Sequence, residues 1–132
     1  MGYALAGFDE IVGVDFFPMP NYPACYPFEF VEGEHAIEYV LKYGHEFDVI
    51  HASPPCQAYS WSAKRWTNVP RRDLVAATRD ALRKVGKPYV IENVVGAPLL
   101  NPIRLCGLMF GKPATLEHPK VLRHRLFESS IP

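Results

Sequence analysis

The chain is poor in cysteine, has no long apolar run and carries no net charge. Its three cysteines, Cys25, Cys56 and Cys106, are far apart and include no Cys-x-x-Cys pair, so neither a disulfide framework nor a zinc site is suggested. No stretch approaches the length of a membrane span, and no signal-peptide pattern precedes the fold. We therefore expect a reduced, cytoplasmic setting. Basic and acidic residues balance at 14 each, so there is no bulk basic signal for nucleic acid.

What the sequence does contain is an alternation of short apolar runs with amphipathic segments, over a length that suits one domain of 132 residues. This alternation predicts an α/β fold. Strands are expected at 11–15, 47–50, 89–94, 103–107 and 125–127, and helices at 35–43 and 73–84. The segment 17–30, rich in proline and aromatic residues, is expected to be a loop. Gly44 and Gly86 are expected to end the two helices.

A proline-rich cysteine loop, Pro54-Pro55-Cys56-Gln57, follows the apolar run at 47–50. Each proline fixes its own backbone angle and restricts the residue before it. The loop should therefore be stiff and able to hold a thiolate in one place beyond a strand end, where open α/β sheets carry their chemistry. The alternative is a buried structural cysteine, since free cysteine is among the most buried residue types.

The strand expected at 89–94 ends in Glu92 and Asn93. The loop and helix between the strand expected at 47–50 and this strand make a βαβ layout. Consecutive parallel strands end at the same edge of a sheet, so Cys56 and Glu92 are expected to face one pocket. Taken alone, Glu92 is equally typical of a surface glutamate. Arg123 and Arg125, further along the chain, are taken alone more typical of a solvated edge strand than of a site.

Together these segments resemble the DNA cytosine-5 methyltransferase family. Pro54-Pro55-Cys56-Gln57 is similar to its nucleophile motif, Glu92-Asn93-Val94 to its glutamate motif, and Arg123-His124-Arg125 to its arginine-x-arginine motif, in the family's order. The Phe-Glu-Ser-Ser that follows is similar to phage-type and other bacterial members, including those of restriction–modification systems. The resemblance implies a Rossmann-like methyltransferase fold. It also implies S-adenosylmethionine as cofactor and double-stranded DNA with a flipped cytosine as substrate.

The resemblance also implies roles for individual residues. Cys56 would add as a thiolate to C6 of cytosine, Glu92 would protonate N3, and Arg125 would hold O2, with Arg123 adding positive charge near the thiolate. Glu92 must then carry a proton, which needs an apolar or anionic setting; the residues expected to supply it are Val90, Ile91, Val94 and Val95. The residues implied at the cofactor are Asp15 for the ribose, Phe16 and Glu34 for the adenine, and Pro54.

A basic loop at 61–72 interleaves Lys64, Arg65, Arg71 and Arg72 with two tryptophans. Cations mixed with aromatic rings suit phosphate contact and base stacking, so the loop is expected to contact DNA, with Gln57 and Ser60 near its base. The alternative is an ordinary solvated basic loop.

Two segments of the family have no counterpart here: the Gly-rich loop that wraps the cofactor, and the target-recognition region with the final helix. Residues 1–132 are therefore expected to be a partial catalytic domain, truncated at both ends, that works with a complementing chain. One alternative is a non-catalytic remnant that keeps the sheet and weak DNA binding. Another is an unrelated cysteine enzyme, for which His51 would be the nearest base.

Overall fold

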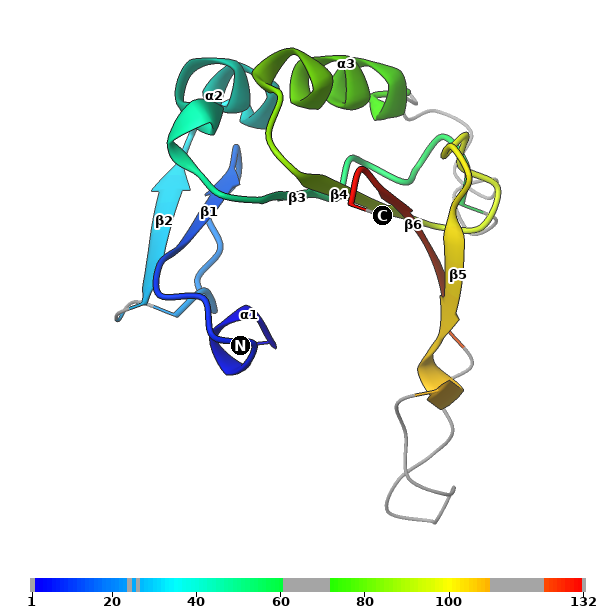
Figure 1. The fold of residues 1–132 in the computed structure, drawn as a ribbon, viewed down its shortest axis with the longest axis horizontal. Helices are drawn as coiled ribbons and strands as arrows, with labels where there is room; N and C mark the ends of the chain where they lie inside the picture. Colours follow the sequence, from blue (N-terminus) through cyan, green and yellow to red (C-terminus); the bar gives the residue numbers. More distant parts are fainter. Residues whose placement is uncertain (1, 24, 26, 61–71, 110–122, 132) are drawn as a thin grey trace.

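The computed structural model describes residues 2–23, 25, 27–60, 72–109 and 123–131, which form a mixed α/β fold (Figure 1). No helix in these ranges is long and apolar enough to cross a membrane. The elements, in chain order, are α1 (Gly2–Leu5), β1 (Ile11–Asp15), β2 (Phe28–Glu32), α2 (Ala36–Tyr43), the 3₁₀ turn η1 (Gly44–Glu46), β3 (Ile50–Ala52), α3 (Val75–Val85), β4 (Tyr89–Asn93), β5 (Ile103–Cys106), the 3₁₀ turn η3 (Gly107–Met109) and β6 (His124–Ser129).

The strands lie in two sheets. β1 and β2 form a parallel pair, and the second sheet has the order β3-β4-β6-β5. Within the second sheet β3 and β4 are parallel, whereas β6 runs antiparallel to both β4 and β5. Because α3 links β3 to β4, the predicted βαβ unit is confirmed, and with it the α/β class.

Helix α3 covers one face of the second sheet and forms the core with it (Figure 1). Its buried residues recur at helical spacing, at Val75, Thr78, Arg79, Ala81 and Leu82. Ala77 of this helix is exposed, while Arg79 is buried because it has a buried acidic partner. The helix starts where the Asp73 carboxylate accepts a hydrogen bond from the Val75 amide at 3.1 Å. It ends at Gly86, whose left-handed φ of 76° confirms the predicted stop.

Two segments differ from the prediction by more than two residues. The strand expected at 47–50 begins only at Ile50, because the chain at 44–46 first makes a 3₁₀ turn that the Phe47 amide closes onto the Gly44 carbonyl. The loop expected at 17–30 contains the start of β2. The Tyr22 ring lies 6.1 and 5.0 Å from the rings of Phe28 and Phe30. This aromatic packing stabilises a strand that the proline content had hidden.

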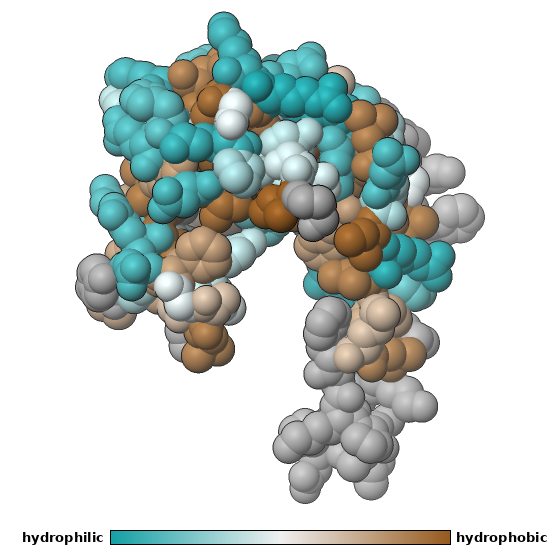
Figure 2. Space-filling view, in the orientation of Figure 1, coloured by the Kyte–Doolittle hydropathy of each residue, from teal (hydrophilic) through white to brown (hydrophobic). Residues whose placement is uncertain are grey.

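The two faces of the second sheet differ in character. Tyr89, Ile91 and Asn93 of β4 are buried on the face under α3. Side chains alternate along a strand, so Val90 and Glu92 lie on the other face. Figure 2 shows that the molecule is hollowed on this side, between α1 and β5. Glu92, one of the predicted catalytic residues, therefore lies on the open face of the sheet.

Candidate functional site

The cysteine loop is joined to the end of β4 by the side chain of Asn93. The Asn93 amide nitrogen donates a hydrogen bond to the Pro54 carbonyl at 2.9 Å, and its amide oxygen accepts one from the Val94 amide at 2.8 Å. Asn93 is only 2% exposed. The nucleophile and glutamate motifs, far apart in the sequence, are therefore in direct contact. The contact partner of Pro54 is thus Asn93.

Cys56 itself lies at the start of a turn. Its carbonyl accepts hydrogen bonds from the amides of Tyr59 and Ser60, at 3.0 and 2.9 Å. The thiol is free and half-buried, while Gln57 beside it is exposed. Burial, and then nearby Asp73, raise the pKa of Tyr59 to about 12, so this phenol remains neutral next to the turn.

Glu92 and Arg125 form an ion pair across β4 and β6. The guanidinium Nε of Arg125 lies 2.5 Å from a carboxylate oxygen of Glu92, with both side chains about three-quarters buried. The strand register places Glu92 opposite Phe127, so Arg125 is a diagonal neighbour on the same face. The prediction that Glu92 lies among apolar or anionic groups was wrong, because its closest charged partner is this cation.

Arg123 is positioned differently from Arg125. β6 begins at His124, so Arg123 lies just before the strand; it is exposed, and its carbonyl accepts a hydrogen bond from Gly107. The structure therefore joins Arg125 to Glu92 but gives Arg123 no ion pair with a described carboxylate.

Three of the four residues expected at the cofactor, Asp15, Phe16 and Glu34, lie at the ends of β1 and β2, in the other sheet. One oxygen of Asp15 accepts a hydrogen bond from the Phe17 amide at 2.9 Å. Phe16 is 53% exposed, and its ring lies 5.2 Å from that of His35. Glu34, one residue before His35, is exposed. A carboxylate with a second oxygen for ribose hydroxyls, beside exposed rings for an adenine, fits the nucleoside end of S-adenosylmethionine.

Three of the residues expected to contact DNA, Gln57, Ser60 and Arg72, are among the described residues. Gln57 lies in the turn after Cys56 and half-buried Ser60 follows it; Gln57 and Arg72 are exposed to solvent. Lys64, Arg65 and Arg71 lie outside the described residues.

His51, the base considered for an unrelated cysteine enzyme, lies within β3. It shares the open face of the sheet with Glu92, and its ring lies 5.7 Å from that of Tyr3 in α1. Desolvation lowers the pKa of His51, and the charge of Glu92 opposes this shift. A base at this position would serve a different cysteine chemistry from the one implied by the motifs.

A buried ion pair that the sequence did not predict holds the segment that follows β4. Arg79 of α3 donates two hydrogen bonds to the Glu128 carboxylate, both at 2.7 Å, and a third to the Pro98 carbonyl at 2.8 Å. Glu128 also accepts a hydrogen bond from the Leu100 amide at 2.9 Å. The segment after Glu92 and Asn93 is thereby fixed to α3 and β6. A buried arginine on the core side of an amphipathic helix is the signal that could have revealed it.

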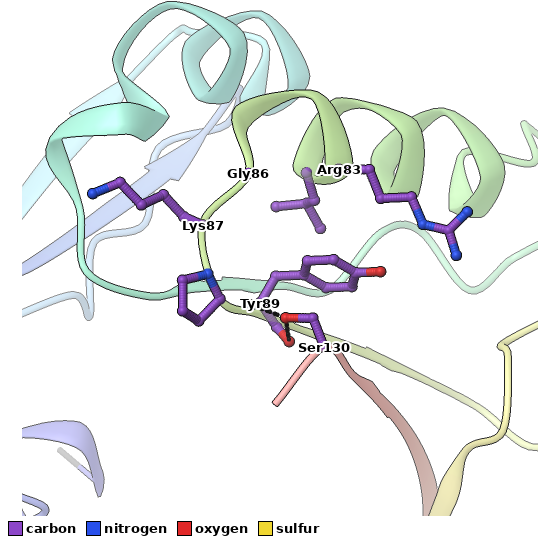
Figure 3. A pocket seen from close by; sticks show the side chains of 7 residues that line it. Arg83, Gly86, Lys87, Tyr89 and Ser130 are labelled. Atoms are coloured by element: carbon purple, nitrogen blue, oxygen red, sulfur yellow. Dashed lines mark hydrogen bonds between the residues drawn. The ribbon is translucent and has the colours of Figure 1, made fainter. Parts of the chain in front are cut away.

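A shallow pocket of about 370 Å³ lies elsewhere, at the start of β4 (Figure 3). It is lined by Leu82, Pro88 and Tyr89, with the charged ends of Arg83 and Lys87 directed away from one another. Because Glu92 and Asn93 are at the far end of the same strand, this pocket is separate from the candidate site.

No protein-family model, curated protein or solved structure matches the chain. The described residues also contain no group of three or more His, Cys, Asp or Glu side chains placed to hold a metal ion. The function has to be inferred from the two linked motifs and the ion pair.

Proposed function

We propose that this chain carries the reaction centre of a DNA cytosine-5 methyltransferase of the phage or bacterial type. One observation carries the proposal: Asn93 bonds to the cysteine loop while its neighbour Glu92 pairs with Arg125. Residues from all three motifs, distant in the sequence, thus meet at β3, β4 and β6. Residues that served only as surface charges would not be expected to converge in this way.

The proposed reaction begins with the Cys56 thiolate. It forms a bond to C6 of a cytosine flipped out of the duplex, and the electrons of the C5–C6 double bond make C5 nucleophilic. Once the base has separated it from Arg125, the Glu92 carboxylate takes up a proton from solvent and donates it to N3, which neutralises the charge on the ring, and Arg125 binds O2. After C5 is methylated, loss of its proton expels the thiolate and restores the aromatic ring. Because Glu92 and Arg125 are paired at rest, the base must separate them as it enters.

S-adenosylmethionine, when bound, supplies the methyl group. Asp15, Phe16 and Glu34 would hold its nucleoside end, as the half-buried carboxylate of Asp15 and the exposed side chains of Phe16 and Glu34 suggest. Gln57 and Ser60, with Lys64 and Arg65, would contact the DNA, and Arg123 would add positive charge near the phosphates or the thiolate. A complementing chain would unite the two sheets into one Rossmann-like sheet.

A second candidate is a non-catalytic remnant that keeps the sheet and weak DNA binding. The separation of β1-β2 from β3-β4-β6-β5 favours it, because cofactor and cysteine residues then belong to different sheets. The two candidates differ in one respect that can be measured, which is covalent attack by Cys56.

The test is covalent trapping. A mixed-sequence duplex containing 5-fluorocytosine is incubated with saturating S-adenosylmethionine and with the chain reconstituted with a complementing chain that supplies the missing segments. Fluorine cannot leave as a proton does, so the thiol–C6 bond persists. Peptide mass spectrometry should find the DNA on Cys56. Cys25→Ser and Cys106→Ser should retain the adduct and Cys56→Ser should lose it. Attachment at Cys25 or Cys106, or no adduct at all, would favour the remnant.

A further inference from the structure

We propose that Asn93 is a positioning residue, which fixes the cysteine loop on the end of β4 so that the Cys56 thiol is presented beside Glu92. The inference deepens the proposed function and rests on it for its catalytic part. Whether Asn93 holds the loop in place can be measured without DNA or cofactor.

The direction of the Asn93 amide is fixed by its two partners. The Val94 backbone N–H can only donate, so it must meet the amide oxygen; the Pro54 carbonyl can only accept, so it must meet the amide nitrogen. At 2% exposure no bulk water replaces either partner. Asparagine is therefore the side chain of this size that satisfies both.

The Pro54 carbonyl lies two residues before Cys56, and the Cys56 carbonyl is fixed by the turn at Tyr59 and Ser60. The cysteine is thus held on both sides. The turn is internal to the loop and would travel with it. Asn93 differs because it belongs to β4, the strand that carries Glu92. It therefore sets the position of the loop relative to the glutamate.

Asn93→Asp is the sharpest variant, because it keeps the shape and removes one donor. An ionised carboxylate still accepts from Val94 but faces the Pro54 carbonyl with a second acceptor. A protonated carboxyl can donate to that carbonyl and restore the contact. In this variant the fraction of molecules in which the cysteine loop has left β4 should therefore increase as pH rises. Asn21→Asp, an exposed asparagine in a loop, is the matched control.

The measurement is the alkylation rate of each thiol by iodoacetamide, taken as the ratio of variant to parent at each pH. Cys25 and Cys106 report on the fold as a whole, and Cys56 reports on the loop. We expect the Cys56 ratio to rise several-fold at high pH and to return toward one at low pH, with Cys25 and Cys106 unchanged. Asn93→Ala should raise the Cys56 ratio at every pH.

Trapping by 5-fluorocytosine DNA should move in the opposite direction and slow by about 10²-fold, because a loosened thiol is misplaced for attack. A Cys56 ratio of one in both variants at every pH would overturn the inference. So would equal acceleration of all three thiols, which would make Asn93 a residue of the general fold. If the Cys56 ratio changes but the parent chain forms no DNA adduct, Asn93 still positions the loop and the proposed function fails instead.

Discussion

Glu92 and Arg125 form the charged centre of the open sheet face, and each limits what the other can do. Their ion pair is about three-quarters buried, so removing one member leaves the other partly desolvated without a partner. In the proposed reaction both groups must turn from each other to the cytosine ring. The two residues are therefore expected to act as a unit.

Replacing Glu92 by glutamine should slow covalent trapping on 5-fluorocytosine DNA by about 10²- to 10⁴-fold, the range of a lost general acid. The amide keeps the shape but cannot give a proton to N3. Glu38→Gln, an exposed change on α2, is the matched control and should trap at the parental rate.

The double variant Glu92→Gln with Arg125→Met sharpens this experiment. If the residues act as a unit, it should be hardly slower than Glu92→Gln alone. Multiplicative losses would instead mean that Arg125 contributes independently of the pair.

Among the elements, the contact of α3 with β6 depends on the Arg79–Glu128 pair, whose side chains are 10% and 3% exposed. Changing Glu128 to glutamine should lower the free energy of unfolding by about 3–5 kcal/mol, because the Arg79 charge is then buried without a counter-ion. Denaturant unfolding measures this, with Glu38→Gln as control. The paired change Arg79→Met with Glu128→Leu should cost less than the sum of its single changes; a strictly additive result would contradict the coupling.

The same pair predicts the acid stability of the fold. Burial tends to raise the pKa of Glu128, but the Arg79 hydrogen bond, the Leu100 amide and the positive charges outweigh it, so the pKa is lowered in the folded state. A carboxyl with a lowered folded pKa stabilises the protein fully above its unfolded pKa of about 4.5. That contribution is lost as pH falls through the lower folded value. The parent should therefore lose stability below about pH 5, and Glu128→Gln should lose less over the same range in acid titrations followed by circular dichroism.

The sequence predicts well those elements whose signals lie within their own residues. β1 was predicted residue for residue, and α3 to within two residues at its start, because the helical periodicity and the stop at Gly86 agree there. β2 was missed because its support comes from Tyr22, which lies in the segment before it. In the site, the motifs indicated Cys56, Glu92 and Arg125, but the partners of Asn93 and Arg79 are carbonyls and carboxylates brought together only by the fold.

Over the whole molecule, both sheets have an open edge. The amide of Ile11 and the carbonyl of Asp15 bond toward β2, so the peptide groups of Val12 and Val14 face away from it. The amide of Ile50 bonds toward β4, so the groups of His51 likewise face away. Neither edge is paired with another described strand, and such edges recruit strands from other chains.

We therefore expect the isolated 132-residue chain to associate with itself, to bind S-adenosylmethionine weakly and to methylate DNA poorly or not at all. Apolar side chains such as Leu5 at 89% and Phe17 at 69% exposure add to the tendency to associate. Sedimentation, calorimetric titration with the cofactor and a radiolabelled-methyl assay on mixed-sequence DNA measure the three properties.

Val12→Pro tests whether association comes from the open edge of β1 rather than from the exposed apolar side chains. The Val12 N–H faces the open edge, so proline should reduce association without separating β1 from β2. Val12→Ala keeps this N–H and should leave association unchanged. A monomer that binds the cofactor tightly and turns over repeatedly would show that the two sheets already form a complete enzyme, with no strand needed between them.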